Sequence, residues 1–264
     1  GSPLRGITYE LPVPSAQVKS AILLAGLFAD GTTRVREPAR LRDPTERQLA
    51  RLGAGYRTEE GGWRCVEGGH ELAAADWRVH GDLCSAAFPL VAAAILPRSE
   101  LALRGVGVNP TKAGLLEVLL RMGANLSVVN EREEDGEPVA DLVLKGGAPL
   151  KGVRVGGDLV PRLIDEIPAL AVAACFAEGV TVIRDAGELR LKESDRIAAM
   201  ARELGRLGAK VGVLPDGLAI EGGAALKGAP VESHGDHRVA MALAVAALAA
   251  EGETTIADTA CVDT

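Results

Sequence analysis

Charged side chains concentrate in one short segment, Glu188–Arg196, whose residue types suit anion binding and proton transfer. Lys192, Glu193 and Arg196 are three or four residues apart, a spacing that places them on one face where a helix begins. Free backbone amides at a helix start attract anions, so a strand-to-helix junction here predicts an anion site. Helix capping alone would explain the serine and aspartate of this segment, and both interpretations stay open.

A pair of carboxylates, Asp165 and Glu166, stands directly before the apolar run Ile167–Ala177. A carboxylate in a cleft of low dielectric constant can act as a general base. The same two residues could instead cap the helix that this run predicts. The sequence therefore offers a candidate base together with a purely structural alternative.

The segment His234-Gly235-Asp236-His237-Arg238 precedes a second apolar run, Ala240–Ala250. A metal site would need a third and a fourth ligand at suitable spacing, and none is nearby in the sequence, so no metal is predicted. Arg238, beside a glycine and two histidines, suits an anion clamp. A capping cluster remains the alternative.

Weaker candidates open two further helices. Ser15 is a good N-cap residue ahead of Ala16 and Gln17, and Arg42-Asp43 leads into a helix with acidic residues in its first turn. Polar groups thus recur where successive helices begin. Together they predict a pocket for small polyanions, such as phosphorylated or carboxylated metabolites, lined by Arg42, Lys192, Arg196 and Arg238.

An internal repeat supplies the elements that would position these groups. An Ala/Leu-rich helix, a small turn and a β-like run recur, and a loose fourth copy lies at Leu90–Leu103; the three clear copies are Leu23–Val35, Leu170–Ile183 and Leu243–Ile256. A glycine-capped helix end, Arg-Leu/Met-Gly-Ala, also recurs three times. The predicted unit is helix, strand, helix, strand and a further strand over about 70–80 residues, longer than the usual solenoid period.

The repeat helices are apolar on nearly every face, which predicts helices buried on all sides with sheets outside them. Ordinary doubly wound α/β layers are the alternative. Either architecture is an α/β fold.

Composition excludes several classes of protein. The chain has 264 residues, of which 47% are hydrophobic, so intrinsic disorder is excluded. A net charge of -7 disfavours nucleic-acid binding, and the apolar runs are too short to cross a membrane. The four cysteines lie far apart without a CxxC pair, as expected in a reducing cytoplasm.

Six segments, in this order, resemble the 5-enolpyruvylshikimate-3-phosphate synthase family: Ser15-Ala16-Gln17-Val18-Lys19-Ser20, Arg42-Asp43, Asn109-Pro110-Thr111, Leu163-Ile164-Asp165-Glu166-Ile167-Pro168, Lys192-Glu193-Ser194-Asp195-Arg196 and His234-Gly235-Asp236-His237-Arg238. The sister family, UDP-N-acetylglucosamine enolpyruvyl transferase, fits less well and is the alternative enzyme. The resemblance implies an inverse α/β barrel built from βαβαββ units. It also implies that residues 1–80 form the C-terminal part of the domain that binds shikimate 3-phosphate, and residues 81–264 most of a second domain.

The resemblance further implies enolpyruvyl transfer from phosphoenolpyruvate to the 5-hydroxyl of shikimate 3-phosphate, without metal or organic cofactor. Ser15, Ala16, Gln17 and Arg42 are expected to bind shikimate 3-phosphate. Asp165 is expected to be the base beside Lys192, and Glu193 to move a proton at the phosphoenolpyruvate methylene. The expected phosphoenolpyruvate site is lined by Arg196, His237 and Arg238.

The family's N-terminal third and extreme C-terminus have no counterpart in this sequence, so the chain alone is expected to be inactive. A binding half without catalysis is the non-enzyme alternative. The full-length protein is expected to be a cytoplasmic monomer whose partners are its two small-molecule substrates, with no nucleic acid or membrane involved.

Overall fold

The computed structural model describes residues 3–263, and these fall into two compact units. Unit 1 comprises Gly1–His80 together with Val108–Thr111 and Arg132–Val139, and unit 2 comprises the remainder. The chain thus passes from unit 1 to unit 2 at His80–Gly81, and two later segments return to unit 1. The outermost residues of the two predicted domains, at positions 1, 2 and 264, lie outside the described residues.

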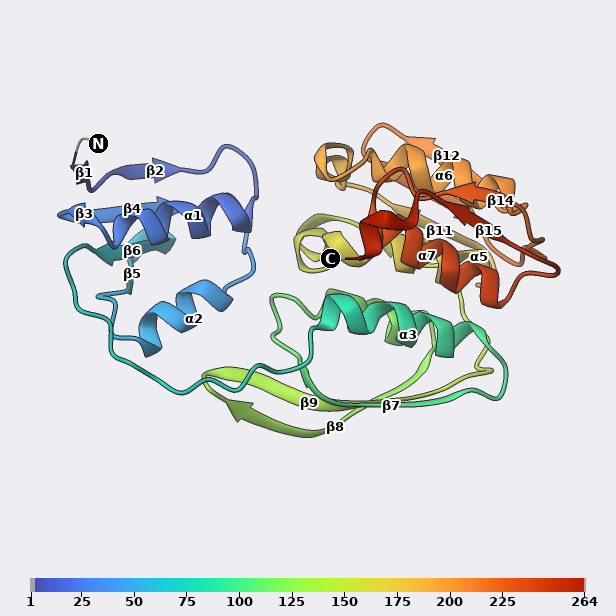
Figure 1. Ribbon diagram of the computed structural model, residues 1–264, viewed down its shortest axis with the longest axis horizontal. Helices are drawn as coiled ribbons and strands as arrows, with labels where there is room; N and C mark the ends of the chain where they lie inside the picture. The colour runs from blue at the N-terminus through green and yellow to red at the C-terminus, as the bar shows by residue number, and fades with distance from the viewer. Residues whose placement is uncertain (1–2, 264) are drawn as a thin grey trace. The chain divides into compact units, whose positions relative to one another are not determined.

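Unit 1 contains one complete βαβαββ repeat (Figure 1). Its four-stranded sheet has the order β2-β4-β6-β5, with β2 and β4 parallel and the other neighbours antiparallel. A short parallel pair, β1 with β3, extends the same plan. The elements are β1 (Leu4–Arg5), β2 (Thr8–Glu10), α1 (Ala16–Gly26), β3 (Ala29–Asp30), β4 (Thr32–Arg36), α2 (Pro44–Arg51), β5 (Arg57–Glu59) and β6 (Trp63–Glu67).

Unit 2 repeats this plan in its middle segment. The sheet order β10-β11-β13-β12 matches that of unit 1, again with the first pair parallel and the rest antiparallel. The elements are β10 (Arg154–Val155), α5 (Ile167–Cys175), β11 (Val180–Ile183), α6 (Arg196–Arg206), β12 (Lys210–Leu214) and β13 (Gly217–Glu221).

Two further copies flank this segment. In the earlier copy, an isolated parallel bridge between Gly81 and Val106 stands in the place of the first strand, and the sheet order is β7-β9-β8. The later copy begins with the parallel pair β14 and β15. Their elements are α3 (Leu83–Ile95), β7 (Glu100–Gly107), α4 (Gly114–Arg121), β8 (Asn125–Glu134), β9 (Glu137–Lys145), β14 (Pro230–Glu232), α7 (His237–Leu248) and β15 (Thr255–Ala257). Short 3-10 turns lie at Glu60–Gly62, Gly157–Arg162, Ile164–Glu166, Gly187–Leu191 and Thr259–Val262.

The first helices of the unit 2 repeats, α3, α5 and α7, pack against one another, with sheets outside them. All nine residues of α5 are buried, because its alanines and valine let neighbouring helices approach from every side. The predicted inverse α/β barrel is confirmed, and the doubly wound alternative is wrong. One detail differs: Ala244 and Leu248 of α7 are exposed, so this helix is not buried on every side.

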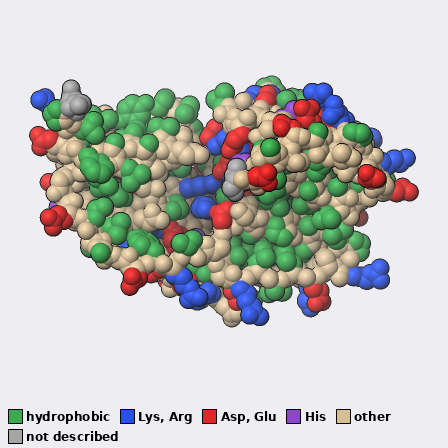
Figure 2. Space-filling view, viewed as in Figure 1, with side chains coloured by type: hydrophobic (Ala, Val, Ile, Leu, Met, Phe, Trp, Pro, Cys, Tyr) green, Lys and Arg blue, Asp and Glu red, His purple; other side chains and the backbone are tan. Residues whose placement is uncertain are grey.

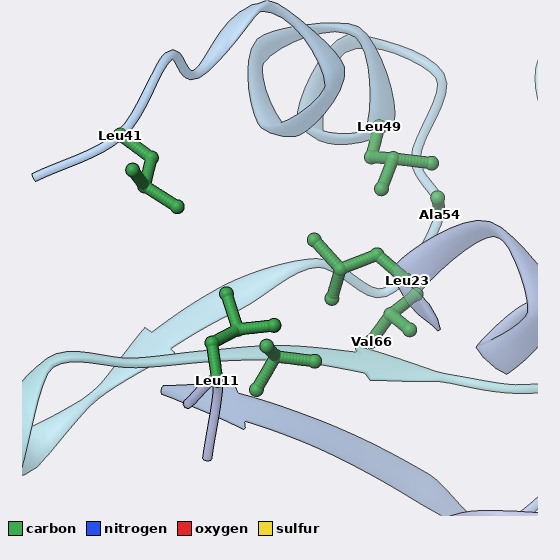
Figure 3. Packing of buried hydrophobic residues seen from close by; sticks show 7 residues of the cluster. Leu11, Leu23, Leu41, Leu49, Ala54 and Val66 are labelled. Atoms are coloured by element: carbon green, nitrogen blue, oxygen red, sulfur yellow. The ribbon is translucent and has the colours of Figure 1, made fainter. Parts of the chain in front are cut away.

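Helix α1 occupies the corresponding position in unit 1 but buries only one stripe, Lys19, Leu23 and Gly26. Leu23 joins a core with residues from the sheet, α2 and the connecting segments, drawn in Figure 3: Leu11, Val35, Leu41, Leu49, Ala54 and Val66. The opposite face of α1 is apolar and exposed, and Phe28 just beyond it is 81% exposed. Figure 2 shows hydrophobic side chains spread over the surface of this unit.

Glycines at equivalent positions permit the tight packing of each repeat. Gly68, Gly146 and Gly222 follow the last strand of their repeats, and each donates its amide to the turn after the repeat's first helix. A Cβ at any of them would overlap backbone carbonyl oxygens at the C-terminal end of that helix. The helix end and the sheet can therefore approach this closely only without a side chain.

Replacing Gly222 by alanine is expected to destabilise unit 2 by about 3 kcal/mol, since its Cβ would overlap the carbonyl oxygens of Ala174 and Ala177. Urea unfolding followed by far-UV circular dichroism measures this loss. Trp63 and Trp77 lie in unit 1, so tryptophan fluorescence follows that unit separately. Gly187→Ala is the control: a Cβ there meets no atom within 4 Å, and its effect should stay within about 0.5 kcal/mol. Equal stability of the two variants would contradict the role of Gly222.

Within residues 3–263, no helix combines the length and apolar character needed to cross a membrane.

Candidate functional site

A cluster of charged side chains in unit 2 lies where α5, α6 and α7 begin. Asp165 stands in the 3-10 turn before α5, and Lys192 ends the 3-10 turn that leads toward α6. Arg196 is the first residue of α6, whose N-cap Asp195 accepts a hydrogen bond from the amide of Ala198 at 3.0 Å. The repeat therefore brings three distant segments of the chain to one place.

Arg196 lies at the centre of this cluster, with a fully buried side chain. Its Nε donates to Asp236 Oδ2 at 2.8 Å, and its two terminal nitrogens reach Asp165 Oδ1 at 3.3 Å and Glu193 Oε2 at 2.5 Å. Three carboxylates thus surround one guanidinium, which satisfies the charge of a group that is costly to bury unpaired.

Asp236 is the buried partner that holds Arg196 and also begins α7. Its side chain accepts hydrogen bonds from the Arg238 amide at 2.9 Å and from Ser194 Oγ at 3.0 Å. Burial alone would raise the pKa of Asp236, but the hydrogen bond and charge of Arg196, with those two donors, bring its pKa below the ordinary value. Asp236 therefore stays ionised in the folded protein at neutral pH.

Asp165 lies among three cationic side chains. Besides the Arg196 contact, its Oδ1 is 3.7 Å from Lys192 Nζ, and its backbone carbonyl accepts a hydrogen bond from Arg238 Nη1 at 3.2 Å. Lys192 also pairs with Glu188 at 3.0 Å. A carboxylate and an ammonium group at this separation can act together on one hydroxyl, the carboxylate taking the proton and the ammonium group stabilising the oxygen.

Glu193 and His237 differ in how they are held. The Glu193 side chain is 47% exposed and pairs with Arg196, so it is more accessible than Asp165, Asp236 and Glu188. His237 is the first residue of α7 and is half-buried. No polar contact of the His237 ring is found within the part of the chain that the structure describes.

The four residues predicted to bind shikimate 3-phosphate lie in unit 1. Ser15 is the N-cap of α1, and its Oγ accepts a hydrogen bond from the amide of Val18 at 3.4 Å. Ala16 and Gln17 form the first turn of α1, and Arg42 directly precedes Asp43, the N-cap residue of α2. The structure thus groups these four in unit 1 and the other six predicted residues in unit 2.

The structure tests helix capping as the alternative explanation for two of the predicted segments, Glu188–Arg196 and Asp165–Glu166. Asp195, rather than Ser194, caps α6, which leaves the Ser194 hydroxyl to bond Asp236. Glu166 occupies the N-cap position of α5 without making a side-chain capping hydrogen bond. Capping therefore explains neither Ser194 nor Glu166.

Of the buried charged residues that sequence reasoning missed, Asp236 and Lys19 lie nearest the predicted site residues. Asp236 lay within a motif already singled out, yet its role depends on Arg196 and could not be derived from neighbouring residues. Lys19 had a usable signal, because it lies four residues before Leu23 and seven before Gly26, on the stripe that α1 buries. Among the described residues, no group of three or more His, Cys, Asp and Glu side chains could hold a metal ion.

Comparison with known proteins identifies the family. The family model for EPSP synthase (3-phosphoshikimate 1-carboxyvinyltransferase) matches residues 1–264. Relatives named 3-phosphoshikimate 1-carboxyvinyltransferase include one from Geobacter sulfurreducens, 56% identical over 264 residues, and one from Gloeobacter violaceus, 60% identical over 261 residues. These alignments cover 100% and 99% of this chain but 61% and 60% of the relatives, so the chain spans about three fifths of their length.

A solved structure of an EPSP synthase from Acinetobacter baumannii superposes with a TM-score of 0.88 at 47% sequence identity. That match covers 98% of this chain and 60% of the other. The sequence match and the shared fold therefore agree over 98% of the chain. The chain belongs to the EPSP synthase family.

Proposed function

We propose that the protein containing this chain transfers the enolpyruvyl group of phosphoenolpyruvate to the 5-hydroxyl of shikimate 3-phosphate and releases phosphate. The grouping of Asp165 with Lys192, Arg196 and Arg238 is the observation that carries this proposal. The names of the closely similar relatives give 3-phosphoshikimate and the carboxyvinyl group, and the family resemblance implies phosphoenolpyruvate as the donor of that group. The sister activity, on UDP-N-acetylglucosamine, draws no support from the family match.

In the first step, Asp165 takes the proton of the 5-hydroxyl while Lys192 stabilises the oxygen that forms. The oxygen attacks C2 of phosphoenolpyruvate, and Glu193 donates a proton to its methylene carbon. The result is a tetrahedral intermediate that carries both substrates. In the second step, Glu193 takes a proton back from the new methyl group, the double bond re-forms and the C2–O bond to phosphate breaks. The departing phosphate takes the proton that Asp165 removed from the 5-hydroxyl, so both carboxyl groups return to their starting states. One molecule of phosphate leaves for each ether bond made.

The arginines supply fixed positive charge for phosphoenolpyruvate, with His237 beside them. Arg196 binds Glu193 through Nη2, which also donates to Asp236 Oδ1 at 3.3 Å, and Glu193 is half exposed. An incoming anion can therefore replace the Glu193 carboxylate while the 2.8 Å bond from Arg196 Nε to Asp236 is kept. Anion binding would then release Glu193 for proton transfer. Donors that Asp236 and Asp165 already orient need little reorganisation as charge develops on the substrate.

Unit 1 contributes the binding of shikimate 3-phosphate in this proposal. The start of α1, with Ser15, Ala16 and Gln17, presents backbone amides and polar side chains suited to an anionic ligand. Arg42 adds the positive charge that a phosphate requires. No cofactor takes part, so all charge stabilisation falls to these side chains and the backbone.

Phosphate release from phosphoenolpyruvate plus shikimate 3-phosphate tests the proposal. The chain is assayed alone and after mixing with the separately produced remainder of a relative. We expect turnover only on mixing, because the chain spans about 60% of its relatives. Turnover by the chain alone would contradict the expected inactivity. If shikimate 3-phosphate binds but neither sample shows turnover, the alternative of a binding half without catalysis is favoured instead.

We propose that the full-length enzyme is a monomer in the cytoplasm. All four cysteines are free thiols, which suits a reducing compartment. Sedimentation of the full-length protein at micromolar concentration checks the monomeric state, and a stable dimer would contradict it.

A further inference from the structure

Lys19 is a fully buried lysine in unit 1, and its ammonium group has three partners. It donates hydrogen bonds to Glu37 Oε2 and to the backbone carbonyl of Arg42, each at 2.9 Å, and it pairs with Glu46. Glu37 also pairs with Arg64 at 3.3 Å. The side chains of Glu37 and Glu46 are no more than 7% exposed, so this cluster is cut off from solvent.

The Arg42 carbonyl belongs to a peptide group that is held from both sides. Its oxygen accepts from Lys19, and the amide of the same peptide, on Asp43, donates to Thr111 Oγ1 at 3.2 Å. Thr111 is 1% exposed and bonds Asn109 Oδ1 at 2.7 Å. Asp43 in turn accepts from the side-chain amide of Asn109 at 2.8 Å.

These contacts join two segments to the Arg42–Asp43 peptide. Lys19 belongs to α1, which begins at the predicted substrate residues Ser15, Ala16 and Gln17. Thr111 belongs to a segment that returns from unit 2 to unit 1. With its carbonyl and the following amide both bonded, the Arg42 backbone has little freedom to rotate.

A buried ion cluster is a poor source of stability, because desolvation of the charges offsets much of their attraction. It does, however, fix geometry, since moving any member leaves a buried charge without a partner. We infer that Lys19 and Thr111 are positioning residues that hold Arg42 at a set place relative to the start of α1. The inference rests on the proposed role of Arg42 in binding shikimate 3-phosphate. Pre-set geometry matters there because misplacement by about 1 Å can cost a hundredfold in rate.

The test uses steady-state kinetics of the complete enzyme that contains this chain. Lys19→Met removes the hydrogen bond to the Arg42 carbonyl, and Thr111→Val removes the one from the Asp43 amide. Both substitutions keep the side-chain volume roughly constant. We expect each to raise KM for shikimate 3-phosphate by about tenfold, with KM for phosphoenolpyruvate and kcat changed less than about threefold. Ser20→Ala is the matched control: it removes a 2.9 Å contact with Thr45 between α1 and α2 but touches neither side of the peptide. Its kinetic constants should stay unchanged.

A double-mutant cycle separates positioning from general damage. If Lys19 acts through Arg42, Lys19→Met should have little further effect on KM in an Arg42→Ala background. If the double variant raises KM by the product of the two single-variant factors, the inference is overturned. Unchanged KM in both Lys19→Met and Thr111→Val would also overturn it. Should Lys19→Met fail to fold, Thr111→Val carries the same cycle. A parent enzyme that does not turn over the two substrates rejects the proposed function, and this inference with it. If the parent enzyme turns over normally but neither single variant changes KM for shikimate 3-phosphate, the inference is rejected and the proposed function stands.

Discussion

Replacing Asp165 by asparagine in the complete enzyme is expected to lower kcat about a thousandfold. The amide keeps the size of the carboxylate but cannot take the proton of the 5-hydroxyl, and general bases contribute about a hundred- to ten-thousandfold to rate. Lys192 keeps its partner Glu188 at 3.0 Å, and α5 keeps its apolar packing, so the fold should survive. Phosphate release at saturating substrates measures kcat.

Asp158→Asn serves as the matched control for this substitution. Asp158 precedes the same helix and is exposed, so the same change of charge should leave kcat within about twofold. An Asp165→Asn enzyme with near-normal kcat would remove Asp165 from the role of base. Loss of substrate binding with kcat retained would instead make it a binding residue.

Replacing Asp236 by asparagine is expected to destabilise unit 2 by about 3 kcal/mol at neutral pH. Breaking a buried ion pair leaves one charge poorly compensated and usually costs about 3–5 kcal/mol. The lower value applies because Arg196 keeps its contacts with Asp165 and Glu193. Urea unfolding followed by far-UV circular dichroism, with tryptophan fluorescence as the separate record of unit 1, measures the difference.

The difference in unfolding free energy between the parent protein and Asp236→Asn should become smaller at acidic pH. The folded-state pKa of Asp236 is depressed, so its ionised form stabilises the fold above the unfolded-state value, about 4. That contribution is lost as pH falls through the lower folded-state pKa. The gap between the parent protein and Asp236→Asn should thus stay constant from about pH 7 to 5 and shrink below about pH 4. A gap that widens toward acid would contradict the assigned direction.

Local patterns in the sequence were sufficient to predict the repeat. The continuous apolar run of α5 and the recurring glycine-capped helix ends are set by neighbouring residues. The structure confirms both, since α5 is fully buried and Gly53, Gly123 and Gly208 follow helix ends with positive φ. The segments that meet at the charged cluster were likewise visible, because helix starts attract polar residues whether or not they bind a ligand.

The pairings within this cluster, and those around the Arg42–Asp43 peptide of unit 1, could not be predicted in the same way. Asp236 and Arg196 are 40 residues apart, and Asp43 and Thr111 are 68 apart, so only the folded chain shows which donor meets which acceptor. Capping was also an adequate local explanation for Ser194 until the structure assigned that role to Asp195. A motif can therefore locate a site in the sequence without revealing how its charges are held.

The glycines after the last strand of each repeat bear on how this sequence can evolve. Gly68, Gly146 and Gly222 face helix-end carbonyl oxygens, and Gly6, Gly152 and Gly228 face backbone atoms of a neighbouring strand or turn in the same recurring way. Apolar side chains in the cores of the repeats can be exchanged for other apolar side chains, whereas a side chain at these glycine positions would overlap backbone atoms. Selection should therefore preserve the repeat most strictly at its glycines, the positions that have no side chain.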